Sequence, residues 1–167
     1  MQPYDDEFTR FVTASAPTLT RLAWFLTGNT ETAADILQDT YTKTYIAWGR
    51  IRPHEALAYA RTTLTHTNID RHRRQHGESH LPPGFDIPTT TDTAETIAQR
   101  DHIARLLAPL PTRQRQVITL RYALDLSEQT TADTLGITVG AVKQAASRAL
   151  QTLRAHAVAP ADKEYTR

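Results

Sequence analysis

Apolar residues recur every three or four positions along most of the chain, the spacing of helices that bury one face. The stretches with this pattern are residues 5–25, 31–48, 55–75, 96–107, 113–124, 128–135 and 139–154. Pro17 lies inside the first stretch and predicts a bend or a break there, because proline lacks the N–H that continues a helix. The pattern predicts an all-α protein.

The two helices between residues 124 and 154 have the clearest boundaries. Ser127 and Thr138 are placed to cap the helix starts, and Gly136 suits the left-handed residue that ends the first helix. On the second helix one line is apolar: Val142, Ala146, Ala149 and Leu153. The opposite line is slim and polar, comprising Gly140, Gln144, Ser147, Arg148 and Gln151, with Lys143 and Arg154 beside it.

Amides, hydroxyls and guanidinium groups read base edges in a major groove, and Lys and Arg hold phosphates. A solvated surface helix would also show polar residues outward, so this face alone is ambiguous. The preceding short helix and the glycine turn favour a helix-turn-helix, with the second helix, from Val139, as the recognition helix.

Charge divides the chain. Its formal charge is +1, yet residues 78–95 contain four acidic residues and no Lys or Arg, together with three prolines and a threonine cluster. This composition is typical of an extended linker. We therefore predict two small helical domains, 1–77 and 96–156, joined by a flexible acidic linker at 78–95 and followed by a tail at 157–167. The chain has no cysteine and no apolar run of membrane-spanning length, and its N-terminus is acidic, which favours a cytoplasmic protein without a membrane partner.

Basic residues gather at two places in the first domain. One is the loop from Gly49 to His54, and the other is the run Arg71 to Arg74 at the end of the third predicted helix. Cations at a helix C-terminus ease its dipole, but four in a row exceed that need and indicate phosphate contact. The spacing of His72, His76 and His80 would suit a metal in a continuous helix, but Gly77 interrupts the helix and arginines repel a cation. We expect no metal and no cofactor.

Three motifs in order resemble those of the extracytoplasmic-function (group IV) sigma factors of bacterial RNA polymerase. Residues 33–45, AADILQDTYTKTY, are similar to the family's core-binding helix. Residues 110–122, LPTRQRQVITLRY, resemble the opening of its second domain, and residues 135–150, LGITVGAVKQAASRAL, resemble its recognition helix. The resemblance covers about residues 5–156.

The resemblance implies a sigma factor that binds core RNA polymerase and reads two promoter elements without catalysing chemistry itself. The residues that contact core polymerase would be Asp35, Gln38, Asp39 and Lys43, and they would bind the clamp helices of the β′ subunit. The flap of the β subunit would be a second polymerase contact. The minus 10 element would be held by Arg50, Arg52, His54, Arg61, His66, Asn68, Arg71, Arg73 and Arg74. The minus 35 element would be read by Arg121, Val139, Gly140, Lys143, Gln144, Ser147, Arg148 and Gln151.

Two points stay open at this stage. The third helix departs from the family pattern, so either His66 or Asn68 occupies the place of its usual asparagine. An anti-sigma factor is a further partner that the sequence neither requires nor excludes. The alternative functions are a dimeric helix-turn-helix regulator that is not a polymerase subunit and, with less support, a small helical hydrolase using the histidines and Asp70.

Overall fold

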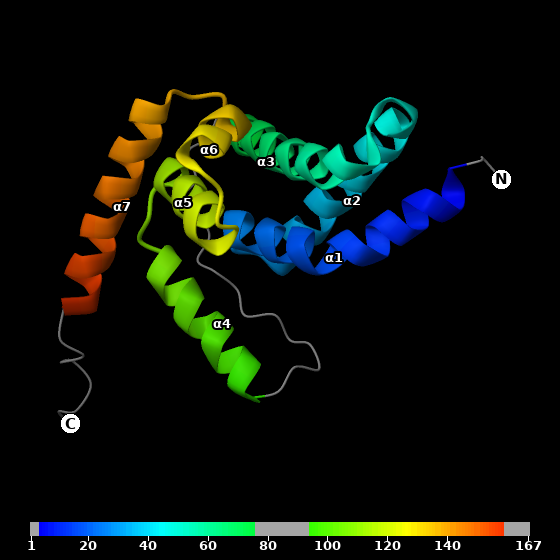
Figure 1. Cartoon of the computed structure of the whole chain (residues 1–167). Helices are drawn as coiled ribbons and strands as arrows, with labels where there is room; N and C mark the ends of the chain where they lie inside the picture. Colours follow the sequence, from blue (N-terminus) through cyan, green and yellow to red (C-terminus); the bar gives the residue numbers. More distant parts are fainter. Residues whose placement is uncertain (1–3, 76–93, 159–167) are drawn as a thin grey trace.

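The computed structural model describes residues 4–75 and 94–158, and the helices that fill these ranges form two bodies (Figure 1). The first body comprises α1 (Asp5–Thr27), α2 (Thr30–Ala47) and α3 (Ala56–Gln75). The second comprises α4 (Ala94–Leu107), α5 (Thr112–Ile118), α6 (Glu128–Leu135) and α7 (Val139–Val158). The predicted all-α fold is confirmed. Most of the predicted linker, and the tail from residue 159, lie outside the described residues.

Helix α1 continues through Pro17, so the predicted break does not occur. Proline inside a helix costs about 3 kcal/mol. Packing on both sides of it offsets this cost. Before Pro17, the rings of Phe8 and Phe11 each lie 5.0 Å from that of Trp48, and after it Leu19 and Leu22 are fully buried.

The connections in the first body are short and well capped. Gly28 ends α1 in the left-handed conformation, at φ 65°, and its N–H donates to the Trp24 carbonyl at 2.7 Å. Asn29 begins α2 by accepting the Thr32 N–H on its side-chain oxygen at 2.7 Å. The predicted basic loop contains two short 3-10 turns, η1 (Trp48–Arg50) and η2 (Pro53–Glu55).

In the second body, α5 runs into a wide π-helical turn, η3 (Thr119–Ala123). The Leu124 N–H donates to the carbonyl of Thr119, five residues back, at 3.2 Å. The turn keeps Leu120 fully buried, and η3 contacts α1 and α6. None of the helices in the described ranges combines the length and apolar character needed to cross a membrane.

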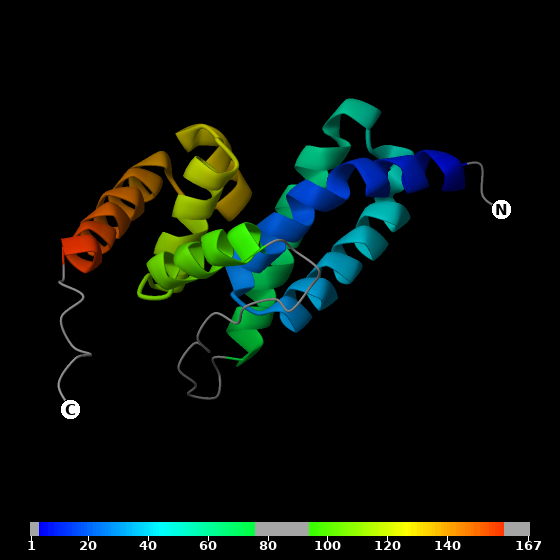
Figure 2. The same ribbon diagram turned by 90° about the horizontal axis from the view of Figure 1, so that it is seen from below.

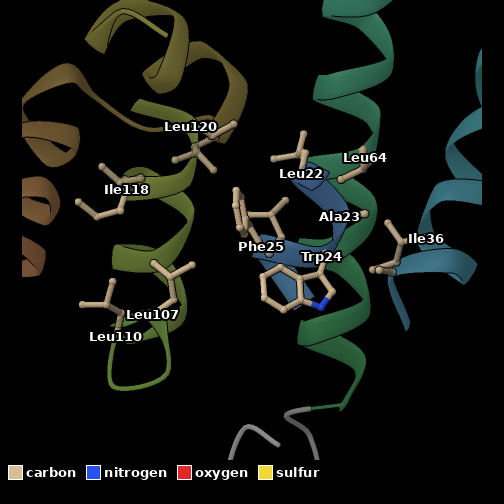
Figure 3. Packing of buried hydrophobic residues seen from close by; sticks show 14 of the residues in the cluster. Leu22, Ala23, Trp24, Phe25, Ile36, Leu64, Leu107, Leu110, Ile118 and Leu120 are labelled. Carbon is tan, nitrogen blue, oxygen red and sulfur yellow. The ribbon is translucent and has the colours of Figure 1, made fainter. Parts of the chain in front are cut away.

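The two bodies lie side by side and meet at the C-terminal half of α1 (Figure 2). Their buried apolar side chains form one cluster, in which Leu22 and Phe25 of α1 face Ile118 and Leu120 of the second body (Figure 3). Hydrogen bonds join the bodies beside this cluster. They run from Arg21 Nη2 to the Ala123 carbonyl at 3.4 Å, between His66 Nε2 and the Thr134 carbonyl at 2.8 Å, and between His72 Nε2 and Thr112 Oγ1 at 3.0 Å.

Candidate nucleic-acid interface

The predicted helix-turn-helix is present, and its boundaries are those that the sequence indicated. The Ser127 hydroxyl accepts the Thr130 N–H at 3.0 Å and begins α6. Gly136 ends that helix at φ 64°, and the Ile137 N–H donates to the Ala132 carbonyl at 3.1 Å. The Thr138 hydroxyl accepts the Ala141 N–H at 3.1 Å and begins α7. These local bonds fix the angle at which α7 leaves the turn.

Helix α7 has one buried line and one exposed line. Val142 and Ala149 are fully buried against α5 and α6. The exposed line comprises Gly140, Lys143, Gln144, Ser147, Arg148 and Gln151, while Val139 is half-buried at the helix start. Gly140 keeps this face slim because it has no side chain. The space around it is open, since an added Cβ would meet nothing closer than Thr138 Oγ1 at 3.9 Å. This face can therefore enter a DNA groove and present amide, hydroxyl and cationic groups to the bases and phosphates.

Two arginines of this body donate to backbone carbonyls. Arg121, expected on the DNA-facing side, donates to the Leu126 carbonyl and lies 5.8 Å from the centre of the Tyr122 ring. Arg115 is only 7% exposed and donates to the Leu110 carbonyl at 3.3 Å. Burial lowers the pKa of its guanidinium.

Lys143 has an acidic neighbour on α6. Its Nζ lies 3.6 Å from Glu128 Oε2, and both side chains are more than a third exposed. Glu128 lies in the first turn of α6, at the positive end of the helix dipole. It also neutralises one cation of the recognition face.

The residues predicted to hold the minus 10 element form two separate groups. Arg50, Arg52 and His54 are exposed on the loop before α3, whereas Arg73 and Arg74 are exposed at the other end of that helix. An α-helix rises about 1.5 Å per residue, so the start of α3 and Arg71 lie about 22 Å apart along the helix axis. The structure does not bring these groups into one patch, so a nucleic acid would have to run along α3 to touch both.

The middle of α3 distinguishes His66 from Asn68. The Asn68 side chain is only 7% exposed, whereas His66 is exposed. Because a carbonyl oxygen only accepts, His66 Nε2 donates to the carbonyl of Thr134. Arg61 is half-buried, its Nε has no hydrogen-bond partner within the part of the chain that the structure describes, and burial lowers its pKa. Of these three side chains, His66 is the most exposed.

All four predicted polymerase-binding residues of α2 are exposed, and two of them contact α3. Asp35 Oδ2 lies 3.5 Å from Arg71 Nη1, and Lys43 Nζ donates to Thr67 Oγ1 at 3.0 Å. Gln38 and Asp39 are exposed on the same helix.

Beside Gln38 lies an apolar groove that sequence reasoning missed. It is lined by Phe8, Ala34, Leu37, Gln38, Tyr41, Thr42 and Tyr45. The signal was the pair Tyr41 and Tyr45, one turn apart on α2, of which Tyr41 is half-buried and Tyr45 is exposed. The Tyr45 hydroxyl donates to Asp5 Oδ1 at 2.7 Å, and this bond raises the pKa of Tyr45.

No group of three metal-ligating side chains occurs within residues 4–75 and 94–158. Of the spaced histidines, His76 and His80 lie outside the described residues, and His72 contacts Thr112.

Comparison with known proteins accounts for both bodies. Residues 11–78 match the description of sigma-70 region 2, and residues 100–153 match that of sigma-70 region 4. The chain is 32% identical over 156 residues to the RNA polymerase sigma-E factor of Streptomyces coelicolor, covering 92% of this chain and 87% of that protein. It is 32% identical over 139 residues to the extracytoplasmic-function sigma factor SigD of Mycobacterium tuberculosis, covering 78% of this chain and 65% of that protein.

Two solved structures share the fold. One is the sigma factor RpoE in complex with the anti-sigma factor NepR from Bartonella quintana, with a TM-score of 0.65 and 20% identity, covering 92% of this chain and 99% of that one. The other is CnrH in complex with the cytosolic domain of CnrY, with a TM-score of 0.65 and 21% identity, covering 92% and 89%.

Sigma regions 2 and 4 thus occur in order, and relatives above 30% identity extend over most of the chain. These findings do not favour the alternative of a dimeric regulator that acts without polymerase. The chain belongs to the sigma-70 family of RNA polymerase sigma factors, in its extracytoplasmic-function group, and directs promoter-specific transcription initiation.

Proposed function

We propose that this sigma factor reads the minus 35 element with α7. The observation that carries the proposal is the exposed line of α7, where Lys143, Gln144, Ser147 and Arg148 follow directly on a capped turn. Gln and Ser side chains can bond base edges, and Arg148 can bond a guanine with two N–H groups. Lys143, at the edge of the line, is suited to a phosphate.

Region 2 binds the minus 10 element. Arg50, Arg52 and His54 form an exposed basic loop, and Arg73 and Arg74 supply cations at the far end of α3. A melted strand lying along α3 would meet both groups, since phosphates attract cations without regard to sequence. Of the two candidates for the family's asparagine, His66 is the one at the surface, so we assign the place to His66.

Core polymerase is the partner proposed for the outer side of α2. Gln38 and Asp39 are exposed there next to the apolar groove of Tyr41 and Tyr45. A mixed surface with an apolar centre and a charged rim is typical of a protein interface. The clamp helices of the β′ subunit are the proposed occupant, and the β flap is proposed to hold region 4.

Three further proposals follow from the family. The chain acts in the cytoplasm, where the polymerase works, and the nucleotidyl transfer is the polymerase's own reaction. An anti-sigma factor is a further proposed partner, supported by the partners named for both solved neighbours.

Run-off transcription tests the minus 35 assignment. Core polymerase is supplied with the intact chain, with Arg148→Ala or with Lys143→Ala, on genomic promoter fragments. Arg148→Ala should lose about 1–3 kcal/mol of base discrimination and relax the choice of promoter. Lys143→Ala should weaken all promoters evenly and lower the slope of log affinity against log salt by about one.

Arg10→Ala is the matched control, because it removes an exposed guanidinium on α1, remote from α7. Unchanged promoter choice in Arg148→Ala would contradict the assignment of α7.

A further inference from the structure

We propose that α7 reads an adenine with Gln144 and a guanine with Arg148, on base pairs that lie one or two steps apart in the minus 35 element. The proposal rests on the proposed function, because it names the bases that the exposed line of α7 would contact. Three properties of the two side chains support it: their freedom, their spacing and the hydrogen bonds that each can make.

The first property is that both side chains are free. Gln144 and Arg148 are exposed, and neither side chain has a hydrogen-bond or ion-pair partner within residues 4–75 and 94–158. Their neighbour Lys143 is different, since its Nζ lies 3.6 Å from the Glu128 carboxylate. The amide of Gln144 and the guanidinium of Arg148 can therefore meet a base without first breaking a bond to the described part of the protein.

The second property is a fixed spacing. Thr138 caps the start of α7, and Val142 and Ala149 are fully buried on the opposite side, so the helix cannot turn another face to the DNA. Gln144 and Arg148 are four residues apart, which places them on one face and about 6 Å apart along the axis. Base pairs stack about 3.4 Å apart, and zinc-finger residues three or four apart contact successive bases. The two side chains therefore face base pairs one or two steps apart.

The third property is the pattern of donors and acceptors. The amide of Gln144 has an N–H donor and an oxygen acceptor, which together match the N7 acceptor and the N6 donor of adenine. Guanine presents two acceptors there, N7 and O6, so the amide oxygen would face another acceptor. Arg148 has donors only, and these match N7 and O6 of guanine but meet the N6 donor of adenine. Each side chain therefore accepts one purine and rejects the other.

Other residues of the exposed line do not make this choice. Ser147 has one hydroxyl, which can donate or accept and so fits any base edge. Gly140, one turn before Gln144, has no side chain, and Gln151 lies in the C-terminal half of α7, whereas recognition helices read bases with their N-terminal residues. Gln144 and Arg148 should therefore each discriminate against the wrong base pair by about 5- to 140-fold.

Randomised promoters test this assignment with the full chain bound to core polymerase. A genomic fragment that supports run-off transcription is chosen, the base pairs of its minus 35 element are randomised, and the fragments that the polymerase retains are sequenced. The intact chain should enrich one A·T and one G·C base pair, one or two steps apart. Each should be favoured over the other base pairs by about 5- to 140-fold.

Exchanged side chains give the sharpest readout. Gln144→Arg should change the preferred base at the adenine position to guanine and leave the guanine position unchanged. Arg148→Gln should change guanine to adenine at its own position only. Glutamine and arginine favour helix equally, so neither exchange disturbs α7. The matched control is Gln129→Arg, which adds the same guanidinium at an exposed position of α6 and should leave both base preferences unchanged.

Base analogues test the individual hydrogen bonds without a change in the DNA sequence. Replacing the adenine by 7-deazaadenine removes only the N7 acceptor and should weaken promoter binding by the intact chain by about 2- to 12-fold. Gln144→Ala should be insensitive to this replacement, because it has no amide to bond N7. In the same way, 7-deazaguanine should weaken binding by the intact chain but not by Arg148→Ala.

Failure of the base assignment and failure of the proposed function give different results. The base assignment is overturned if the exchanges leave both base preferences unchanged, or if Gln144→Ala stays sensitive to 7-deazaadenine, while Lys143→Ala still weakens all promoters. In that case α7 would hold the minus 35 element by its phosphates alone. If no α7 variant alters promoter binding, Lys143→Ala included, the proposed function fails, and the base assignment fails with it.

Discussion

Replacing Glu128 by Gln should increase the affinity of the polymerase-bound chain for its promoter. In the free chain the Glu128 carboxylate lies 3.6 Å from Lys143 Nζ, and a phosphate can use Lys143 fully only after this pair separates. Coulomb's law in water gives about 1.2 kcal/mol at that distance. Screening at physiological salt, with a Debye length of about 8 Å, reduces this to about 0.7 kcal/mol.

That value lies within the range measured for exposed ion pairs, as the exposure of both side chains requires. It corresponds to an increase in affinity of about three-fold, because about 1.4 kcal/mol is a factor of ten. The gain should shrink as salt rises, since both the ion pair and the phosphate contact are screened. Glu128→Gln should also lower the stability of the chain by about 0.3–1 kcal/mol, because Glu128 faces the positive end of α6.

The assay is equilibrium binding of a fluorescent promoter fragment to polymerase that carries each variant, across a series of salt concentrations. Asp125→Asn is the matched control, because it removes an exposed carboxylate from the same turn and leaves the Lys143 pair intact. Asparagine also tolerates the positive φ of 52° found there.

The double variant Glu128→Gln, Lys143→Ala closes the cycle. If Glu128 acts through Lys143, its replacement should gain no more than the Asp125→Asn control once Lys143 is absent. A gain that persists at full size without Lys143, or no gain beyond the control in the first place, would refute the reasoning.

Three predictions concern the fold. Gly136→Ala should lower the free energy of unfolding by about 1–2 kcal/mol, because φ is 64° at this position and the cost is backbone strain alone. Gly140 lies in an ordinary helix, so Gly140→Ala should raise the free energy of unfolding by about 0.5–1 kcal/mol. Urea unfolding measures both changes. Leu64→Ala removes a fully buried side chain and should cost about 2–5 kcal/mol in the same assay. The hydrogen bond to Asp5 raises the pKa of Tyr45, so the stability that this bond gives the fold is complete below pH 10 and is lost as pH rises through the folded pKa. In an ultraviolet titration the Tyr45 hydroxyl should ionise late, and this late step should be absent in Tyr45→Phe.

The helix-turn-helix could be predicted because its signals are local. Ser127, Gly136 and Thr138 act on N–H and carbonyl groups within a few residues, and the period of α7 divides its two faces without knowledge of the rest of the chain. The period of an ordinary helix is less informative across η3, where a hydrogen bond to the fifth residue back rotates the chain differently. The bond from Arg121 to the Leu126 carbonyl, in this part of the chain, could not be predicted from that period.

The contacts between regions 2 and 4 could not be predicted in this way. His66 and Thr134 are separated by 68 positions, and nothing near either residue indicates the other. Helical geometry states only that His66 and Asn68, two residues apart, face different sides of α3. Which side is buried depends on where α1, α2 and α6 pack, and this is a property of the whole fold.

The charged side chains assigned to binding share one further feature, since several already have a partner on a neighbouring helix. Lys143 pairs with Glu128, and Arg71 pairs with Asp35, in both cases with side chains more than a third exposed. Exposed pairs of this kind contribute at most about 1 kcal/mol, so they hold a cation in position without preventing its use by a phosphate. The second pair also connects two surfaces, because Asp35 belongs to the proposed polymerase side and Arg71 to the proposed DNA side. A polymerase contact that takes Asp35 leaves Arg71 without that carboxylate, and we expect Arg71 then to be available to a phosphate of the promoter.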